Sequence, residues 1–505
     1  MMNEQEQHVA QLGTLAGATL LSWMGGATFT HVLTHPINAH SLVAAIKTTP
    51  DNPVLLGATL AGVTLGCAGA YAIKKWNETE FAGAAYSRYL RGSQLVSAKK
   101  LARMTTEKNQ KQITIAGVPI PIDAEPRHLL ISGSTGTGKS VGITEMIGGI
   151  IRRRDRAIII DPDGSMLSRF YFPGDIVLNP FDTRSPGWSI FNEIWNTYDY
   201  ERIALSLIPT SDNKQTEEWN GYARQLFSET ARKLSMIGKA NTAELLQWLL
   251  VAPVDDLKAL LTGTAAQGFF QEGAERAFGS VRFILTSFLT PHKYMSEGNF
   301  SLRDWLAKGK GNLYITWRED MTASLRPLIS AWADIICSAI LSLPADANRR
   351  IWMSLDELAT LERLSSLEDA LTKGRKYGLR VVAALQSTSQ LDEKYGVHGA
   401  TILRSCFRNM MVLGGTRIDS KTSEDLSKAL GEHEVERKQT SHSSSSRGDS
   451  SNQSTKPVKE RLVLPAEIAG LPDLTGYLAF SGDLPIAKVR LTPRTYPVRA
   501  DAFDE

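Results

Sequence analysis

A glycine-rich loop at residues 133–140, GSTGTGKS, most constrains what this 505-residue chain can fold into. The residues before it, HLLI at 128–131, are typical of a buried strand, and apolar residues over 141–151 predict a helix after it. Glycines let successive backbone N–H groups curl around phosphate oxygens, and the positive end of the following helix dipole adds to the same anion site. Strand, loop and helix in this order predict an α/β domain that binds a nucleoside triphosphate.

Each residue of the loop has an expected role in nucleotide binding. Lys139 is expected to reach the β- and γ-phosphates, and the Ser140 hydroxyl is expected to bind Mg²⁺. The predicted nucleotide-binding residues are Gly133, Ser134, Thr135, Gly136, Thr137, Gly138, Lys139 and Ser140. The alternative is a turn rich in Gly, Ser and Thr that matches by chance, but all eight positions and both flanks fit the phosphate-binding pattern.

Two uncharged segments near the N-terminus predict a membrane anchor. Residues 9–33 and 54–73 contain no Asp, Glu, Lys or Arg, and each is long enough as a helix to cross a hydrocarbon layer of ~30 Å. Glycines at four-residue spacing, at positions 13 and 17 and at positions 62 and 66, would allow the helices to approach closely in lipid. We therefore expect a two-span transmembrane anchor over residues 1–76.

Two alternatives to this anchor remain open. A signal peptide would need a basic leader, whereas residues 1–8 carry no Lys or Arg and a second apolar span follows the first. A buried hairpin in a soluble fold is possible because Thr, Ser and His lower the hydrophobicity of the first span.

Basic residues after the second span predict the orientation of the anchor. The loop over 36–53 carries one lysine, Lys47. The basic residues that follow the second span are Lys74, Lys75, Arg88, Arg91, Lys99, Lys100 and Arg103. This asymmetry places the C-terminal body in the cytoplasm, with residues 77–110 as a juxtamembrane linker.

Composition excludes little about the cytoplasmic body. The formal net charge of +3 is too small to indicate nucleic-acid binding by itself. The three cysteines, Cys67, Cys337 and Cys406, lie far apart without metal-ligand spacing. Reduced thiols in a reducing compartment therefore fit better than a disulfide framework.

Periodicity divides the cytoplasmic body into three parts. Residues 111–183 and 300–505 alternate apolar strands with helices, which predicts two parts of one nucleotide-binding domain around a parallel sheet. Residues 184–299 show helical spacing with few strand patterns, which predicts an all-α domain inserted as a small bundle. Residues 438–459 are rich in Ser and too polar to bury a core, so we expect a flexible loop there.

A second chemical element follows the apolar segment over 351–355. This segment ends in Asp356 and Glu357, and a strand that ends in this pair is the usual partner of a phosphate-binding loop. Asp356 is expected to hold Mg²⁺ together with Ser140. Glu357 is expected to orient and polarise the attacking water. The alternative is an acidic strand end at the start of a helix.

Two further residues complete the predicted catalytic set of Lys139, Asp356, Glu357, Gln386 and Arg375. Gln386 follows the apolar strand over 379–385, where an amide can hydrogen-bond both the γ-phosphate and the water. Arg375 follows a predicted helix over 358–373, and in a ring of subunits it could reach the γ-phosphate of a neighbour. A polar loop start at Gln386 and a solvated cation at Arg375 remain open as alternatives.

Taken in chain order, these elements resemble the type IV coupling proteins of conjugative plasmids. They are the two N-terminal spans, the loop at 133–140, DPDG at 161–164, the all-helical insertion, LDE at 355–357 and LQS at 385–387. The resemblance implies a RecA-like P-loop ATPase that uses ATP and Mg²⁺ and assembles as a homo-hexamer on the bacterial inner membrane. It also implies DNA-stimulated hydrolysis that couples a relaxase-bound DNA strand and its relaxosome proteins to the inner-membrane components of a type IV secretion channel.

Three functions remain compatible with these features. The first is a motor that pumps DNA during conjugation. The second is a docking platform that recruits the relaxase or protein substrates and uses ATP as a conformational switch. The third is an ATPase that exports protein substrates only.

Overall fold

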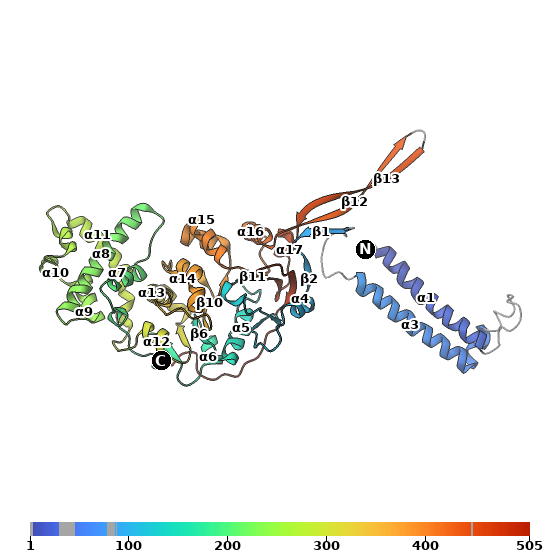
Figure 1. Ribbon diagram of the computed structural model, residues 1–505, viewed down its shortest axis with the longest axis horizontal. Helices are drawn as coiled ribbons and strands as arrows, with labels where there is room; N and C mark the ends of the chain where they lie inside the picture. Colours follow the sequence, from blue (N-terminus) through green and yellow to red (C-terminus); the bar gives the residue numbers. More distant parts are fainter. Residues whose placement is uncertain (1–3, 30–45, 78–85, 87, 446–447, 505) are drawn as a thin grey trace. The chain divides into compact units, whose positions relative to one another are not determined.

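The computed structural model describes residues 4–29, 46–77, 86, 88–445 and 448–504 (Figure 1). It divides into two compact units. Unit 1 comprises Met1–Tyr89 and Val435–Val458, and unit 2 comprises Leu90–Glu434 and Lys459–Glu505.

Unit 1 contains two long helices that pack against each other, α1 (Glu4–Phe29) and α3 (Pro53–Asn77), with a short turn η1 (Thr49–Asp51) before α3 (Figure 1). A Cβ atom at Gly62 would lie 2.7 Å from Thr19 Cα, and one at Gly66 would lie 2.8 Å from Leu15 Cα. These two glycines therefore allow the close helix approach that their spacing predicts. The prediction is wrong for Gly13 and Gly17, because a Cβ atom there would have nothing within 4 Å.

Of the two predicted membrane spans, only the second forms a helix that is apolar enough, within its described residues, to cross a membrane. Within the described residues, two helical stretches are long and apolar enough to cross a membrane, Pro53–Tyr71 and Glu319–Ile340. The second is mostly buried inside unit 2 and is a core helix. Helix α1 has the necessary length but is less apolar, so the two-span anchor stays a prediction.

The predicted flexible loop over 438–459 is instead occupied largely by strands. Strand β12 (Glu432–Ser445) and strand β13 (Gly448–Arg461) form a three-stranded sheet with β1 (Arg88–Gly92), in the order β1-β12-β13. Polar composition excludes a core here, but hydrogen bonds between two backbones require no apolar face. The composition therefore did not reveal this pairing.

A ten-stranded sheet organises unit 2, in the order β2-β15-β14-β11-β5-β10-β9-β6-β8-β7. The strands are β2 (Leu95–Ser97), β5 (Leu129–Ser132), β6 (Arg156–Asp161), β7 (Ile176–Leu178), β8 (Leu313–Thr316), β9 (Ile351–Leu355), β10 (Leu379–Leu385), β11 (Asn409–Leu413), β14 (Thr475–Ala479) and β15 (Ile486–Arg490). The seven strands from β11 to β7 are parallel, as their continuous apolar sequences predict. Strand β14 is antiparallel to its neighbours β11 and β15.

Alternate residues of these strands enter two separate cores, one on each face of the sheet. Ile158 and Ile160 belong to the first core, and Ala157 and Ile159 belong to the second. The helices that begin or pack near the second core are α4 (Ala98–Thr105), α5 (Lys139–Arg153) and α6 (Ser165–Phe170). The small hairpin of β3 (Thr114–Ile115) and β4 (Val118–Pro119) packs there as well.

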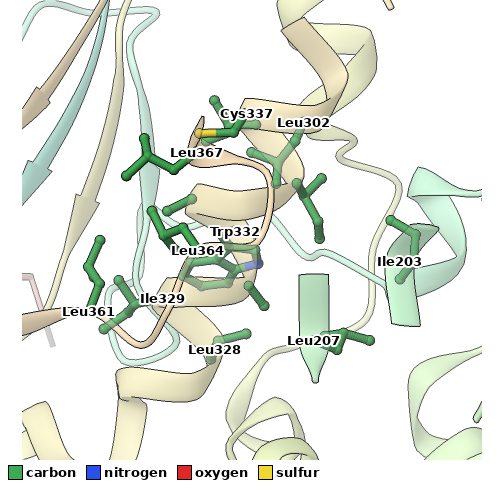
Figure 2. Close-up of a cluster of buried hydrophobic side chains, with 14 of the residues drawn as sticks. Ile203, Leu207, Leu302, Leu328, Ile329, Trp332, Cys337, Leu361, Leu364 and Leu367 are labelled. Carbon is green, nitrogen blue, oxygen red and sulfur yellow. The ribbon is translucent and has the colours of Figure 1, made fainter. Parts of the chain in front are cut away.

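The helical segment expected over 184–299 contributes to the first core. Its helices are α7 (Asp199–Leu207), α8 (Lys214–Met236), α9 (Thr242–Leu246), α10 (Val254–Leu260) and α11 (Glu275–Leu289), and they gather at one end of unit 2 (Figure 1). Their apolar side chains join one continuous core with α13 (Thr322–Ile340) and the sheet. Figure 2 shows Ile203 and Leu207 of α7 near Trp332 of α13. The segment is all-helical as predicted, but it shares its core with the sheet and does not form a bundle of its own.

The remaining helices of unit 2 complete these layers. They are α12 (Leu302–Lys308), α14 (Leu367–Lys373), α15 (Thr388–Cys406), α16 (Ser420–Leu430) and α17 (Pro465–Ala469), with the π-helix η4 (Gln247–Val251) and the 3₁₀ helices η2 (Glu125–Arg127), η3 (Ile190–Glu193), η5 (Ala265–Phe270), η6 (Thr290–Tyr294), η7 (Glu319–Met321), η8 (Leu358–Thr360) and η9 (Gly374–Tyr377).

Part of the predicted linker over 77–110 belongs to the folded body. Strand β2 pairs with β15 at the edge of the large sheet, and α4 buries Leu101 in the second core. A strand of three residues is too short to give a periodic signal, so the sequence did not predict it.

We expect Gly378→Ala to lower the free energy of unfolding by about 2–4 kcal/mol, because Gly378 has φ +91° and a Cβ atom there would overlap the carbonyl of Arg349. Gly263 is the matched control, since it has φ +80° but its Cβ position is open. Gly263→Ala should cost only about 1–2 kcal/mol. Chemical denaturation of both variants measures the difference, and equal costs would contradict this account.

Candidate functional site

Three neighbouring parallel strands bring the predicted site residues to one edge of the sheet. Strand β5 lies between β10 and β11, and β9 lies on the other side of β10. Ser132 at the end of β5 pairs with Leu385 at the end of β10, and Leu355 of β9 pairs with Ala383. The glycine-rich loop, Gln386 and the pair Asp356–Glu357 therefore emerge side by side.

The glycine-rich loop has a conformation that only glycine adopts readily at two positions. Gly136 has φ +81° and Gly138 has φ +110°, and Gly138 is the N-cap of α5. Gly133 leaves no room for a Cβ atom, which would lie 2.7 Å from Leu413 Cβ. Helix α5 begins at Lys139, two residues earlier than the sequence predicts. The loop thus leads directly into a helix N-terminus, which favours bound anions.

Lys139 is buried against the loop that precedes it. Its Nζ donates hydrogen bonds to the carbonyl oxygens of Gly133 (2.9 Å) and Ser134 (3.1 Å). Burial lowers the pKa of Lys139, while the carboxylates of Glu357 and Asp356 raise it. The ammonium group therefore lies between the loop and the two acidic residues, where a γ-phosphate would bring it a third anionic partner.

Ser140 and Asp356 meet as a pair of oxygen ligands. The Ser140 hydroxyl contacts Asp356 Oδ1 at 3.3 Å and Oδ2 at 3.4 Å. Burial raises the pKa of Asp356, the hydrogen bond from Ser140 lowers it, and the nearby Asp163 raises it. Mg²⁺ prefers oxygen ligands and would stabilise the charged carboxylate, so this donor set fits a magnesium ion that also binds phosphate.

Glu357 has an unsatisfied buried oxygen. Among the described residues its Oε1 has no hydrogen-bond partner, and the nearby backbone N–H groups of Ala359 and Gln386 lower the pKa of the carboxyl group. Burial raises the pKa of Glu357, and the charge of Lys139 lowers it. A buried carboxylate oxygen without a partner can accept a proton or a hydrogen bond from water.

Gln386 and Arg375 lie at opposite ends of strand β10, Gln386 after its carboxyl end and Arg375 before its amino end. Gln386 follows β10 directly, and its backbone N–H lowers the pKa of Glu357. Arg375 lies in η9, just before β10 begins at Leu379. The length of β10 separates Arg375 from the glycine-rich loop of its own chain.

The segment between Glu357 and Arg375 differs from its prediction. One helix is expected over 358–373, but the structure has η8, an irregular stretch over 361–366 that ends in a turn, and α14 from Leu367. The leucines at 361, 364 and 367 are buried in the first core and hold this stretch against α13 (Figure 2). Helix α14 ends at Lys373 with Gly374 as its C-cap, as predicted, and the short helix η9 follows it.

Helix α15 contains a residue that the sequence analysis missed. Lys394 Nζ donates to the carbonyl oxygen of Ala359 at 2.9 Å and also to that of Leu361. The N–H of Ala359 is also one of the groups that lower the pKa of Glu357. The hydroxyl of Tyr395 accepts the Leu364 N–H at 3.1 Å in the same stretch. A lone lysine inside a helix gives no sequence signal for this role.

The loop after β11 connects the glycine-rich loop to the end of β10. The Gly414 carbonyl accepts the Ser134 N–H at 2.9 Å and the Ser134 hydroxyl at 3.1 Å. Asp419, the N-cap of α16, accepts the hydroxyl of Ser387 at 2.7 Å. The sequence analysis did not identify this connection, since contacts between loops of different strands leave no local pattern.

Fold and site together define a RecA-like nucleotide-binding protein with an inserted helical domain. Its parallel sheet carries the glycine-rich loop, the acidic pair and the glutamine at the ends of adjacent strands. The chain belongs to the type IV secretion-system coupling proteins, since the model of their DNA-binding domain matches residues 112–492. The family expected from the sequence motifs is therefore confirmed.

Known members of the family are similar over most of the chain. The Coupling protein TraD of Escherichia coli (strain K12) is 31% identical over 428 residues, which cover 82% of this chain and 59% of TraD. The chain thus spans about three fifths of that relative. The coupling protein VirD4 of Bartonella henselae is 29% identical over 54% of this chain and 45% of its own length.

Solved structures of the coupling protein TrwB are more similar. An unbound TrwBdeltaN70 structure is 53% identical, with a TM-score of 0.80, and covers 84% of this chain and 99% of that one. TrwB in complex with ADP and Mg²⁺ is 53% identical, with a TM-score of 0.79, and covers 85% of this chain and 100% of that one. A complex of TrwB with a non-hydrolysable ATP analogue has the same TM-score and identity.

His128 gives the stability of unit 2 a specific dependence on pH. It is fully buried at the start of β5, where Nδ1 accepts the Val381 N–H at 3.0 Å and Nε2 lies 2.9 Å from the Leu371 carbonyl. Burial lowers its pKa from 6.5 to about 4, against the opposing hydrogen bond to Leu371. The unfolded chain therefore binds a proton first as pH falls, so stability is complete above pH 6.5 and is lost toward pH 4.

We expect this histidine to contribute about 3 kcal/mol to the loss of unfolding free energy over that window. The variant His128→Gln should show a shallower decline between pH 6.5 and 4 in urea denaturation, although the starting stability will be lower. The exposed His398 is the control, and His398→Gln should leave the decline unchanged. An unchanged slope in His128→Gln would refute the assignment.

Proposed function

We propose that this chain is an ATP hydrolase of the bacterial inner membrane that pumps DNA during conjugation. The observation that supports this most strongly is the meeting of Lys139, the Ser140–Asp356 pair and the free Glu357 oxygen at one sheet edge. The matched family domain is described as DNA-binding, and TrwB is known in complex with ADP and Mg²⁺. The proposal therefore rests on two findings, the geometry of the site and the family to which the chain belongs.

The site residues receive the following roles. Residues 133–140 bind the phosphates of ATP, with Lys139 at the β- and γ-phosphates. Ser140 and Asp356 hold Mg²⁺, which neutralises phosphate charge when bound. Glu357 accepts a proton from the attacking water, and Gln386 orients that water against the γ-phosphate. Every group except Arg375 comes from the same sheet edge.

Arg375 is proposed to act on a neighbouring copy. Its place at the opposite edge of the sheet excludes contact with a nucleotide in the loop of its own chain. A homo-hexameric ring would bring it to the nucleotide of the next subunit, where a guanidinium group can stabilise transition-state charge. Relaxase and relaxosome proteins and the inner-membrane part of the secretion channel complete the proposed partners.

Apart from the corrections for residues 77–110 and 438–459, the domain division is proposed as expected from the sequence. Residues 1–76 form the two-span anchor, residues 184–299 form the helical domain, and residues 111–183 and 300–505 form the nucleotide-binding domain. The basic residues after the second span support a cytoplasmic body.

We expect Glu357→Gln to bind ATP but to hydrolyse it at least about a hundredfold more slowly, because the amide cannot accept the proton of the attacking water. The measurement is ATP hydrolysis by the full chain in detergent at low salt, with and without single- or double-stranded DNA. The wild type should be stimulated by DNA, since low salt strengthens contacts to the phosphate backbone.

A docking platform predicts a different result. In that case Glu357→Gln would still support full DNA transfer between cells, because ATP binding alone would set the conformation. An equal rate of ATP hydrolysis with and without DNA would also contradict the proposed motor. If the secretion system transfers DNA, the third function, export of protein substrates only, is excluded.

Lys394 is proposed as a positioning residue for Glu357. We expect Lys394→Met to lower kcat about tenfold with little change in KM, because the lost hydrogen bonds fix the Ala359 peptide that orients Glu357. Lys394→Arg should restore part of kcat by keeping a donor there. The exposed Lys258 of α10 is the control, and Lys258→Met should not change either constant. A parallel rise in KM, or no rescue by arginine, would indicate a general structural defect.

A further inference from the structure

A six-residue loop of the helical domain contacts the stretch of chain that follows the acidic pair. Residues 208–213 join α7 to α8, and we name them the coupling loop. The Thr210 N–H donates to the Ser365 hydroxyl at 3.2 Å, and Arg363 Nη1 donates to Asp212 Oδ1 at 2.5 Å. The helical domain thus touches the irregular stretch that lies between the acidic pair and α14.

Hydrogen bonds from α8 fix the coupling loop to that helix. Asn220 Nδ2 donates to the carbonyl oxygen of Pro209 at 2.9 Å, and Asn220 is buried, so this bond is shielded from water. Arg224 Nη1 donates to the carbonyl oxygens of Ile208 at 3.1 Å and Pro209 at 3.3 Å. A displacement of α8 would therefore carry the coupling loop with it.

The stretch that the coupling loop contacts is connected to Glu357. Lys394 Nζ donates to the carbonyl oxygen of Ala359 at 2.9 Å, two residues after Glu357. The guanidinium group of Arg363 lies 5.6 Å from the ring centre of Tyr395, the next residue of α15. Contacts between side chains therefore lead from the coupling loop to the backbone beside Glu357.

Helix α15 is interrupted where the coupling loop meets it. Gly396, inside α15, has φ +69° and ψ 161°, which is not a helical conformation. A Cβ atom at Gly396 would overlap Asp212 Oδ2, so only glycine leaves room for this carboxylate. Asp212 therefore contacts both Arg363 and the interruption in α15, directly after the two residues, Lys394 and Tyr395, that hold the stretch after Glu357.

The ion pair between Asp212 and Arg363 can break and re-form easily. The side chain of Asp212 is 51% exposed and that of Arg363 is 22% exposed, and an ion pair so accessible to water contributes little to stability. The contact at Ser366 is different, because Ser366 and Ser206 of α7 both donate to the carboxylate of the buried Asp334, at 2.9 Å and 2.6 Å. The stretch thus has a fixed end at Ser366 and an adjustable contact at Arg363.

We propose that the coupling loop positions Glu357 according to what the helical domain has bound, with Asp212 and Arg363 as positioning residues. A ligand that displaces α8 moves the coupling loop, and the ion pair passes this displacement to the stretch after Glu357. This direction rests on the proposed function, in which the ligand is DNA. Because binding free energies are coupled reciprocally, a nucleotide at the glycine-rich loop also acts on α8, and this direction does not rest on it.

The first experiment compares ATP hydrolysis with and without DNA. Each variant of the full chain is assayed in detergent without DNA and with saturating single-stranded DNA, and the ratio of the two rates is the fold stimulation. Asp212→Asn and Arg363→Met should each lower the fold stimulation about threefold or more. The double variant should lower it no further, because both substitutions break the same contact.

Glu201→Gln is the matched control for Asp212→Asn. Glu201 forms an ion pair with Arg232 inside the helical domain, and the exposed fractions of the two side chains, 57% and 24%, are close to those of Asp212 and Arg363. This variant should keep the rates of the parent with and without DNA. The inference is overturned if Asp212→Asn is stimulated as strongly as the parent, or if the losses of the two single variants add in the double variant.

Hydrogen exchange separates this inference from the proposed motor. Amide exchange over the coupling loop and α8 is measured in the full chain with and without a non-hydrolysable ATP analogue. The analogue should change the exchange rates there in the parent but not in Asp212→Asn, and unchanged rates in the parent overturn the inference. If the parent shows this change but hydrolyses ATP equally with and without DNA, the proposed motor fails while the coupling stands.

Discussion

Parallel pairing of β5 with β10, and of β10 with β9, decides where every chemical group of the site lies. The hydrogen-bonded register aligns Ser132 with Leu385 and Leu355 with Ala383, so three chain segments leave the sheet at nearly the same height. The pairing holds because each strand is buried on both faces by apolar residues that enter two separate cores. A slip of one residue would exchange those faces and bury different side chains, which makes the register costly to change.

The segment from Glu357 to Gly378 connects the two edges of this sheet. It begins beside Lys139, accepts a hydrogen bond from Lys394, donates one to the hydroxyl of Tyr395, and ends just before β10. Ser366 within it also donates its N–H to the buried Asp334 of α13 at 2.6 Å. A change at the nucleotide could therefore reach the far edge through one continuous stretch of chain.

Much of the nucleotide site could be predicted from the residue types in short segments of the sequence. The glycine-rich loop and the strands that end in Asp356 and Gln386 carry residue types that few other structures require, and their neighbourhood follows from the parallel sheet they imply. What the sequence did not reveal depends on tertiary contacts. Lys394 acts on a peptide 35 residues away, β2 is three residues long, and β12 and β13 pair through backbone groups that any composition provides. The irregular stretch over 361–366 also looked helical, because its leucine spacing suits either a helix or a non-helical segment packed against α13.

The single core that joins α7, α8, α11 and α13 to one sheet face has a consequence for how this family diversifies. A domain with its own core can be exchanged between relatives as a cassette, whereas here the inserted helices complete the surface against which the sheet packs. Replacing them would require matching substitutions on α13 and in the stretch after Glu357. Substitutions on these helices are therefore tolerated best on their outward faces, and their inward faces must change together with the sheet face that they cover.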